Sequence, residues 1–364
     1  MNHEFMEALD ELEKDRGIDK DTLIDTIEQA LLTAYKKNFG AAQNVRVEFD
    51  KDGGDIKVFS QRVVVDESDL YDTFLEIELK DAREISPNYE LGDIIEHEVT
   101  PKDFGRIAAQ TAKQVVVQRI REAEREIVYK EFMDKENEIV TGEVARVNKN
   151  IVHVNLGRIE AVMTQLEQIP GEHYKAGQKI KVYILEVKKT NKGPQIVVSR
   201  SHPGLVKRLF EFEVPEIFEG IVQIKSIARE AGSRTKMAVK SIDDKIDPIG
   251  ACVGPKGSRV KNIVDELGDE KIDIIKYSDD AAEFICAALS PSKVVKVEVN
   301  EAERSALVVV PDYQLSLAIG KEGQNARLAA KLTNWKIDIK SESQAGMESS
   351  VIETSINEDD QIDA

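Results

Sequence analysis

The sequence has little of what secreted, membrane-bound or metal-dependent proteins usually contain. Its 364 residues include two cysteines, one tryptophan and five histidines. Cys252 and Cys286 are too few and too far apart for a disulfide framework or a zinc site, and we expect Cys252 to be a buried thiol. No stretch approaches the roughly 20 apolar residues of a membrane span, and the N-terminus lacks a signal-peptide pattern. These absences predict a cytoplasmic protein with no bound metal and no membrane association.

The sequence also lacks a recognisable catalytic motif. The stretch that begins at Gly250 resembles a phosphate loop superficially, but that motif needs a glycine where Pro255 stands. His97 and Glu98 lack the second histidine of a zinc protease motif, and no spacing of a nucleophile and a base is apparent. We therefore expect no catalytic residues, no cofactor and no enzymatic activity.

A net basic charge, which is common in nucleic-acid-binding proteins, is absent as well. The formal net charge is -18, but it is distributed unevenly. Residues 1–132 carry 18 basic and 31 acidic side chains, and residues 342–364 carry seven acidic and no basic ones. Residues 133–198 carry ten basic and eight acidic side chains, and residues 199–341 carry 22 of each. The middle of the chain can therefore present local basic patches to phosphates.

The first 132 residues are predicted to form an α/β domain that ends in a long helix. Apolar spacing indicates helices over residues 4–15 and 22–38, with Asp21 placed to cap the second helix. Strand-like runs follow at residues 45–49, 56–65 and 76–79, and Asp52-Gly53-Gly54 forms the first turn between them. A helical pattern over residues 104–131 would span about 42 Å, which is long enough to link two domains.

Residues 133–200 are predicted to form a small closed barrel. Five strand-like runs lie at residues 139–147, 151–156, 160–163, 179–187 and 195–199, which suits the OB class of barrels. The run that begins at Thr141, the later Ala176-Gly-Gln and the closing segment that ends at Arg200 resemble an S1 domain. His153 is the one ring at the usual stacking positions, and stacking supplies much of the affinity for single strands. We therefore expect weak RNA binding by this barrel, with His153 and Arg200 as candidate contacts.

Two Gly-x-x-Gly turns form an internal repeat further along the chain. A shift of 66 positions superposes Gly254 on Gly320 and Ile263 on Ala329. Each turn is predicted to join two helices, and each second helix to lead into a strand, at residues 271–274 and 336–339. Glycine accepts positive φ and close approach of another molecule, and the N-terminus of a helix favours an anion. The repeat resembles the KH module, whose loop holds the backbone of about four nucleotides.

The remaining predicted elements complete two such modules. In the first, a linker at residues 201–204 precedes a helix over residues 205–212 and a hairpin formed by residues 221–228 and 235–240. In the second, a helix over residues 281–289 precedes strands at residues 294–299 and 306–310. The segment from residue 342 onward shows no apolar periodicity and is predicted to be disordered.

The candidate RNA-binding residues surround the two turns. The first set is Gly254, Pro255, Lys256, Gly257, Ser258, Arg259 and Lys261, and the second is Gly320, Lys321, Glu322, Gly323, Gln324, Asn325, Arg327 and Lys331. Their cationic side chains can neutralise the phosphates that the glycine backbone brings close. Glu322 is expected to weaken the second module, so the first loop should bind phosphate better.

The order of these parts resembles the NusA family of bacterial transcription elongation factors. The resemblance covers about residues 1–341. It is carried by FGRIAAQTAK at residues 104–113, PGL at 203–205, EVPEI at 213–217, DPIGACVGPKGSR at 247–259 and AIGKEGQNARL at 318–328. It implies that the first domain docks on RNA polymerase near the RNA exit channel while S1 and KH domains hold nascent single-stranded RNA. Pausing, termination and antitermination would be modulated together with other elongation and antitermination factors.

The resemblance also gives the basic residues of the first domain a role. If this domain docks beside the exit channel, Lys36, Lys37, Arg106 and Lys113 could contact an RNA hairpin there. On helix composition alone, a solvated helix face is the simpler interpretation of such residues.

We therefore expect a monomeric, multidomain α+β protein. The expected parts are an N-terminal RNA-polymerase-binding domain (1–132), an S1 barrel (133–200), two tandem KH domains (201–277 and 278–341) and a disordered acidic tail (342–364). An RNA-binding S1/KH protein that acts in RNA degradation or translation is the alternative. The order of the modules and the absence of a large catalytic domain argue against it.

Overall fold

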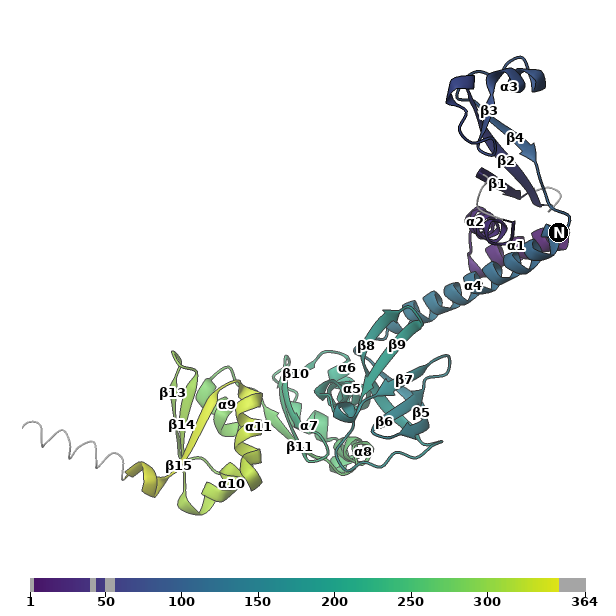
Figure 1. Cartoon of the computed structure of the whole chain (residues 1–364). Helices are drawn as coiled ribbons and strands as arrows, with labels where there is room; N and C mark the ends of the chain where they lie inside the picture. Colours follow the sequence, from purple (N-terminus) through teal and green to yellow (C-terminus); the bar gives the residue numbers. More distant parts are fainter. Residues whose placement is uncertain (1–2, 40–43, 50–55, 347–364) are drawn as a thin grey trace, which may run out of the picture. The chain divides into compact units, whose positions relative to one another are not determined.

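The computed structural model describes residues 3–39, 44–49 and 56–346 (Figure 1). The chain divides into two compact units, residues 1–128 and residues 129–364. No helix within the described ranges is both long and apolar enough to cross a membrane. The predicted turn at residues 52–54 lies outside the described residues.

The first unit packs two helices and the start of a third against a four-stranded sheet. The helices are α1 (His3–Arg16), α2 (Lys20–Phe39) and α4 (Phe104–Met133), and the sheet contains β1 (Asn44–Phe49), β2 (Ile56–Val65), β3 (Glu76–Glu78) and β4 (Ile94–Glu98). Strand β2 is central: it pairs antiparallel with β1 and β4 and parallel with β3. The three strands predicted here are confirmed, whereas β4 and the short helix α3 (Leu79–Ile85) were not predicted.

The start of α2 differs from the prediction by two residues. The Asp19 carboxylate accepts a hydrogen bond of 2.8 Å from the backbone N–H of Thr22, so Asp19 caps the helix. Asp21 lies inside the first turn, which makes the predicted cap wrong. Either aspartate satisfies the sequence rule for a cap, and the true one is set by where the chain enters the helix.

The second unit begins with a closed barrel that confirms the predicted OB-type fold. Its strands are β5 (Ile139–Asn148), β6 (Ile151–Asn155), β7 (Glu160–Met163), β8 (Lys179–Thr190) and β9 (Gly193–Ser199), in the order β5-β6-β7-β9-β8. Alternate side chains such as Val152, Val154, Ala161 and Met163 fill the interior. This alternation is the period-two pattern that made the barrel predictable.

Two modules of the same topology follow the barrel. The first contains α5 (Pro203–Glu213), α6 (Pro215–Phe218), β10 (Val222–Glu230), β11 (Arg234–Ser241), α7 (Pro248–Val253), α8 (Ser258–Glu266) and β12 (Lys271–Lys276). The second contains α9 (Ala281–Ala288), β13 (Lys296–Asn300), β14 (Ser305–Val310), α10 (Leu315–Ile319), α11 (Gln324–Thr333) and β15 (Lys336–Ser341). In both, an antiparallel hairpin is joined by a parallel third strand. The predicted tandem KH fold is thereby confirmed.

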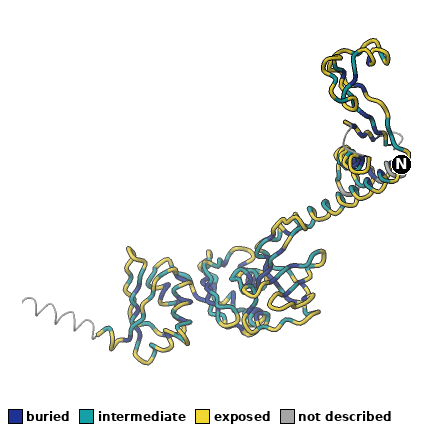
Figure 2. The backbone as a smooth tube through the Cα atoms, viewed as in Figure 1, coloured by how far each residue is buried: buried dark blue, intermediate teal, exposed yellow. Residues whose placement is uncertain are grey.

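Both faces of the first KH sheet are covered. On one face, Met237 and Val239 share a core with Cys252 and with helices α5 and α8. On the other face, Ala228 and Ala238 belong to the core of the second module. Figure 2 shows buried stretches running through the barrel and both modules. Cys252 is fully buried, which confirms it as a buried thiol, and this burial raises the pKa of the thiol to about 12.

The predicted linker at residues 201–204 is a packed junction instead. His202 caps α5 by accepting a hydrogen bond of 3.0 Å at Nδ1 from the backbone N–H of Gly204. Its ring stacks on Tyr183 of the barrel, with 4.9 Å between the ring centroids. A short polar segment predicts a linker, and the aromatic partner that packs on this one lies about 20 residues earlier in the sequence.

The predicted disordered tail begins with ordered residues. Residues 342–346 are helical, and the Ser343 hydroxyl donates a 2.7 Å hydrogen bond to the Asp312 carboxylate. The prediction of disorder is therefore wrong for residues 342–346. Residues 347–364 lie outside the described part of the chain.

Candidate nucleic-acid interface

The two Gly-x-x-Gly loops have nearly the same backbone conformation. Gly254 has φ 72° and ψ 176°, and Gly320 has φ 76° and ψ 171°. This region of backbone space is essentially restricted to glycine. The fourth residue of each loop, Gly257 or Gly323, has φ near 75° as well, at 77° and 75°. The repeat seen in the sequence is therefore a repeat of backbone geometry.

The first glycine of each loop is also required by its surroundings. A Cβ at Gly254 would lie 2.7 Å from Cγ of Arg259, which is part of a flexible side chain. A Cβ at Gly320 would lie 2.8 Å from the backbone nitrogen of Asn325, which cannot move independently of α11. The helix that follows each loop therefore approaches the loop backbone closely. Because the glycine has no side chain, the backbone of another molecule can approach the loop closely from the opposite side.

The third residue of each loop is left-handed without being glycine. Lys256 has φ 51° and ψ 27°, and Glu322, at the equivalent position, has φ 53° and ψ 28°. Both residues are exposed. The same backbone position thus presents a cation in the first loop and a carboxylate in the second.

The residues around the first loop divide into exposed cations and one positioned arginine. Lys256 and Lys261 are exposed, as are Pro255 and Ser258. Arg259 instead donates hydrogen bonds to the carbonyl of Ala251 at 2.6 Å and to Glu216 at 2.9 Å. It therefore ties the start of α8 to α7 and α6, and its guanidinium is less available to a phosphate than the two lysines are.

Around the second loop, Lys321 and Lys331 are exposed cations. Asn325 is only 2% exposed, and its Nδ2 donates to the carbonyls of Leu289 and Ala318. The prediction that Asn325 contacts RNA is therefore wrong, because the side chain faces the core of its own module.

Gln324 and Arg327 bind the first KH module. Gln324 Nε2 donates to Glu230 at 2.9 Å and to the Ser233 hydroxyl at 2.7 Å. Arg327 Nε donates to Glu230 at 2.7 Å, and its Nη1 donates to the carbonyl of Glu322 at 3.1 Å. These two predicted RNA contacts therefore lie where the two modules meet.

Arg200 is an interface residue between the barrel and the first KH module. It is 2% exposed, and its guanidinium makes a bidentate pair with Glu172 at 2.8 and 2.9 Å. It also donates to the carbonyl of Lys181 in β8 and to Glu266 in α8. The prediction that Arg200 contacts RNA is wrong, because its buried guanidinium is paired with the carboxylates of Glu172 and Glu266.

His153 lies on β6, and its side chain is only 19% exposed. Its Nδ1 is 2.8 Å from Glu160 Oε1, and Glu160 also binds Arg146 at 2.6 Å. Stacking of a base on this ring stays a prediction. Weak RNA binding by the barrel stays a prediction as well.

The predicted basic contacts of the first unit are all exposed. Lys36 and Lys37 lie in the last turn of α2, and Arg106 and Lys113 lie two turns apart on α4. The buried Ala108 and Ala112 hold α4 against the core of this unit. The four cations are therefore available to a partner, and their contact with RNA stays a prediction.

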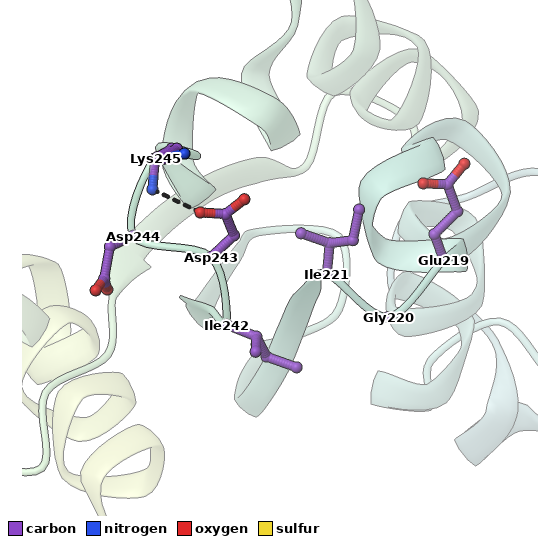
Figure 3. Close-up of a pocket in the computed structure, with 7 residues that line it drawn as sticks. All are labelled: Glu219, Gly220, Ile221, Ile242, Asp243, Asp244 and Lys245. Atoms are coloured by element: carbon purple, nitrogen blue, oxygen red, sulfur yellow. Dashed lines mark hydrogen bonds between the residues drawn. The ribbon is translucent and has the colours of Figure 1, made fainter.

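One cavity in the first KH module has the wrong charge for phosphate. It measures about 660 Å³, and its lining includes Glu219, Asp243 and Asp244 (Figure 3). The Asp243 carboxylate accepts a 2.9 Å hydrogen bond from the backbone N–H of Lys245. Carboxylates repel a nucleic-acid backbone, so we exclude this cavity from the RNA-binding surface. Within the described part of the chain, no group of three or more potential ligands could hold a metal ion.

A closed OB-type barrel followed by two modules with matched Gly-x-x-Gly loops defines a multidomain RNA-binding protein. Comparison with known domain families gives the same order. Residues 4–126 match the NusA N-terminal domain, and residues 133–199 match the S1 RNA-binding domain. Residues 200–277 and 281–346 match the NusA-like first and second KH domains.

Similar curated proteins cover nearly the whole chain. A transcription termination/antitermination protein NusA of Halalkalibacterium halodurans is 60% identical over 95% of this chain and 90% of its own length. The protein of that name from Bacillus subtilis is 58% identical over 99% of this chain and 96% of its own length. The chain belongs to the NusA family of transcription termination/antitermination proteins.

Among solved structures, the solution structure of the N-terminal domain of NusA from Bacillus subtilis is similar to this chain. The sequence identity is 58%, and the match covers 34% of this chain and 99% of the other, with a TM-score of 0.32.

Proposed function

We propose that this protein holds nascent single-stranded RNA on its two KH loops while its N-terminal domain binds RNA polymerase. It thereby modulates pausing, termination and antitermination of transcription. It acts in the cytoplasm as a monomer, by binding rather than by catalysis, and together with other elongation and antitermination factors.

The observation that carries this proposal is the conformational match of the two loops. Two thin glycine loops, each at the start of a helix with exposed lysines nearby, can accept two backbone phosphates of one strand. Lys256 and Lys261 serve the first loop, and Lys321 and Lys331 serve the second. Because phosphate contacts release counterions, we expect the affinity to fall as the salt concentration rises.

The test is charge reversal at one exposed lysine of each loop. The full-length double variant Lys256→Glu and Lys321→Glu should bind a single-stranded RNA at least about 30-fold more weakly at 0.15 M salt. It should still capture core RNA polymerase in a pull-down, because neither lysine belongs to the N-terminal unit. Unchanged RNA affinity would refute the role of the loops, and release of nucleoside diphosphates from poly(A) would refute action by binding alone.

The reciprocal variant tests the N-terminal unit. Arg106→Glu with Lys113→Glu should leave the affinity for free RNA unchanged and shorten hairpin-dependent pauses during transcription in vitro. Pause lifetimes equal to those of the unchanged protein would contradict contact of α4 with RNA at the exit channel.

A further inference from the structure

A carboxylate from the first KH module lies beside the loop of the second. Glu230 ends β10, and its Oε1 accepts from Arg327 Nε at 2.7 Å while its Oε2 accepts from Gln324 Nε2 at 2.9 Å. Arg327 in turn donates to the backbone carbonyl of Glu322, the third residue of the loop. One guanidinium therefore connects the carboxylate of the first module to the loop of the second.

At the first loop the guanidinium of Arg259 is held by Glu216 at 2.9 Å, but that carboxylate belongs to the same module as the loop. The residue equivalent to Arg327 is Lys261, which is exposed and has no carboxylate within ion-pair distance among the described residues. The residue equivalent to Gln324 is Ser258, which is also exposed. The contact made by Glu230 is thus specific to the second loop, although both loops share one backbone.

Glu230 stays ionised at neutral pH. The hydrogen bond from Arg327 has the largest effect on the pKa of Glu230 and lowers it. Burial opposes this with a smaller effect, and the hydrogen bond from Gln324 and the charges of Arg327 and Lys331 lower the pKa further. A phosphate that reaches the second loop therefore meets a negative charge that already binds Arg327 and Gln324. Like charges at such a site repel, and the shared donors cannot satisfy both anions fully.

We propose that Glu230 competes with RNA phosphate for Arg327 and Gln324, so that RNA occupies the second loop only by displacing this carboxylate. This inference rests on the proposed RNA-binding function of the loops. It assigns Glu230 as a residue that sets the difference in affinity between the two modules. It also means that RNA at the second loop removes a contact between the modules.

The test uses Glu230→Gln, which keeps the hydrogen-bonding shape of the side chain and removes its charge. In the full-length protein, this variant should bind single-stranded RNA about three- to tenfold more tightly at 0.15 M salt. The slope of log K against log salt should become steeper by about 0.7, which is the value for one further phosphate contact. In an Arg327→Gln background, the same Glu230→Gln change should have a smaller effect, because only Gln324 is then left to be released.

Glu303→Gln is the matched control for the loss of one negative charge. Glu303 is exposed in the β13–β14 turn. In this turn the backbone carbonyl of Arg304 accepts a hydrogen bond from the backbone N–H of Lys336, which follows the end of α11. It therefore lies at the opposite end of α11 from Gln324, and its substitution should leave the affinity unchanged.

The outcomes separate the inference from the function on which it rests. If the unchanged protein binds RNA and Glu230→Gln binds equally or more weakly, Glu230 only braces the two modules and the inference is wrong. A gain of undiminished size in the Arg327→Gln background would also overturn it. Failure of the unchanged protein to bind any single-stranded RNA would overturn the proposed function and the inference together.

Discussion

The two KH loops agree in backbone and differ in almost every side chain around it. Lys256 and Glu322 occupy one left-handed position with opposite charge. Two positions after each loop, the exposed side of the first module has Arg259, whereas the second has the buried Asn325. The repeated backbone determines where a phosphate can approach, and the side chains determine how strongly it is held. Two loops with the same backbone conformation therefore need not bind phosphate with equal affinity.

The largest expected effect concerns the first glycine of each loop. Gly320→Ala should lower the free energy of unfolding by about 3 kcal/mol, and Gly254→Ala by about 1 to 2 kcal/mol. The backbone strain is the same, but the new Cβ meets backbone at Gly320 and a movable side chain at Gly254. Urea unfolding followed by circular dichroism measures both, and fluorescence of Trp335, the one tryptophan of the sequence, reports on the second module. A larger loss for Gly254→Ala would contradict this explanation.

The residues that brace the loops should give a smaller difference in stability. Asn325→Ala removes a donor from the carbonyls of Ala318 and Leu289, of which Leu289 keeps its hydrogen bonds from Ser292, and should cost about 2 kcal/mol. This cost is partly offset because Asn325 Oδ1 is buried without a hydrogen-bond partner among the described residues. Arg259→Ala should cost about 1 kcal/mol, since its side chain is 25% exposed. The same urea titration compares the two, and equal costs would mean that burial does not distinguish them.

Exchange of the charges at the third loop position should reverse the difference in binding. Lys256→Glu should weaken single-stranded RNA binding about tenfold, and Glu322→Lys should strengthen it about threefold. Both positions are exposed and left-handed, so neither substitution changes the strain of the backbone. Fluorescence anisotropy with labelled RNA measures the two affinities. Unchanged affinity in both variants would show that the loops bind phosphate through their backbone alone.

The smallest effect is the pH dependence of the contact made by Glu230. Its pKa is lower in the folded protein than its usual value, so the contact stabilises the protein above about pH 4.5 and is lost as the pH falls through the lower, folded value. The contribution should be about 0.5 kcal/mol, because the Arg327 side chain is 48% exposed. The difference in unfolding free energy between the unchanged protein and Glu230→Gln, measured by urea unfolding, should therefore be largest at neutral pH and shrink as the pH falls below about 4.5. A difference that does not change with pH would point to packing instead of charge.

The sequence was sufficient for the features that depend on local pattern. The five barrel strands follow from alternation of apolar and polar residues, and the KH repeats follow from two glycine pairs at one fixed offset. The short strand β4 was missed because Ile94 and Ile95 are its only consecutive apolar residues and four of its five positions are exposed. A strand that is mostly exposed gives almost no periodic signal.

Contacts between distant residues could not be predicted. The sequence predicts RNA contact for Arg200, whose actual partners, Glu172 and Glu266, are separated from it by 28 and 66 residues. It also predicts RNA contacts for Arg327 and Asn325, and only the packing of α11 against the first module and its own core shows their different roles. Cations near a binding loop divide into ligand contacts and braces, and sequence alone does not separate the two.

The small side chains Ala228 and Ala238 have a consequence for the length of RNA that the protein accepts. They bring the sheet of the first module into the core of the second, so the two modules share one core. Under the proposed binding of RNA by both loops, this shared core fixes the gap between the two bound phosphates, and the tandem modules select RNA by the length of strand that spans it. A strand that remains extended over that gap can engage both loops at once. A transcript that folds back on itself within the gap can engage only one.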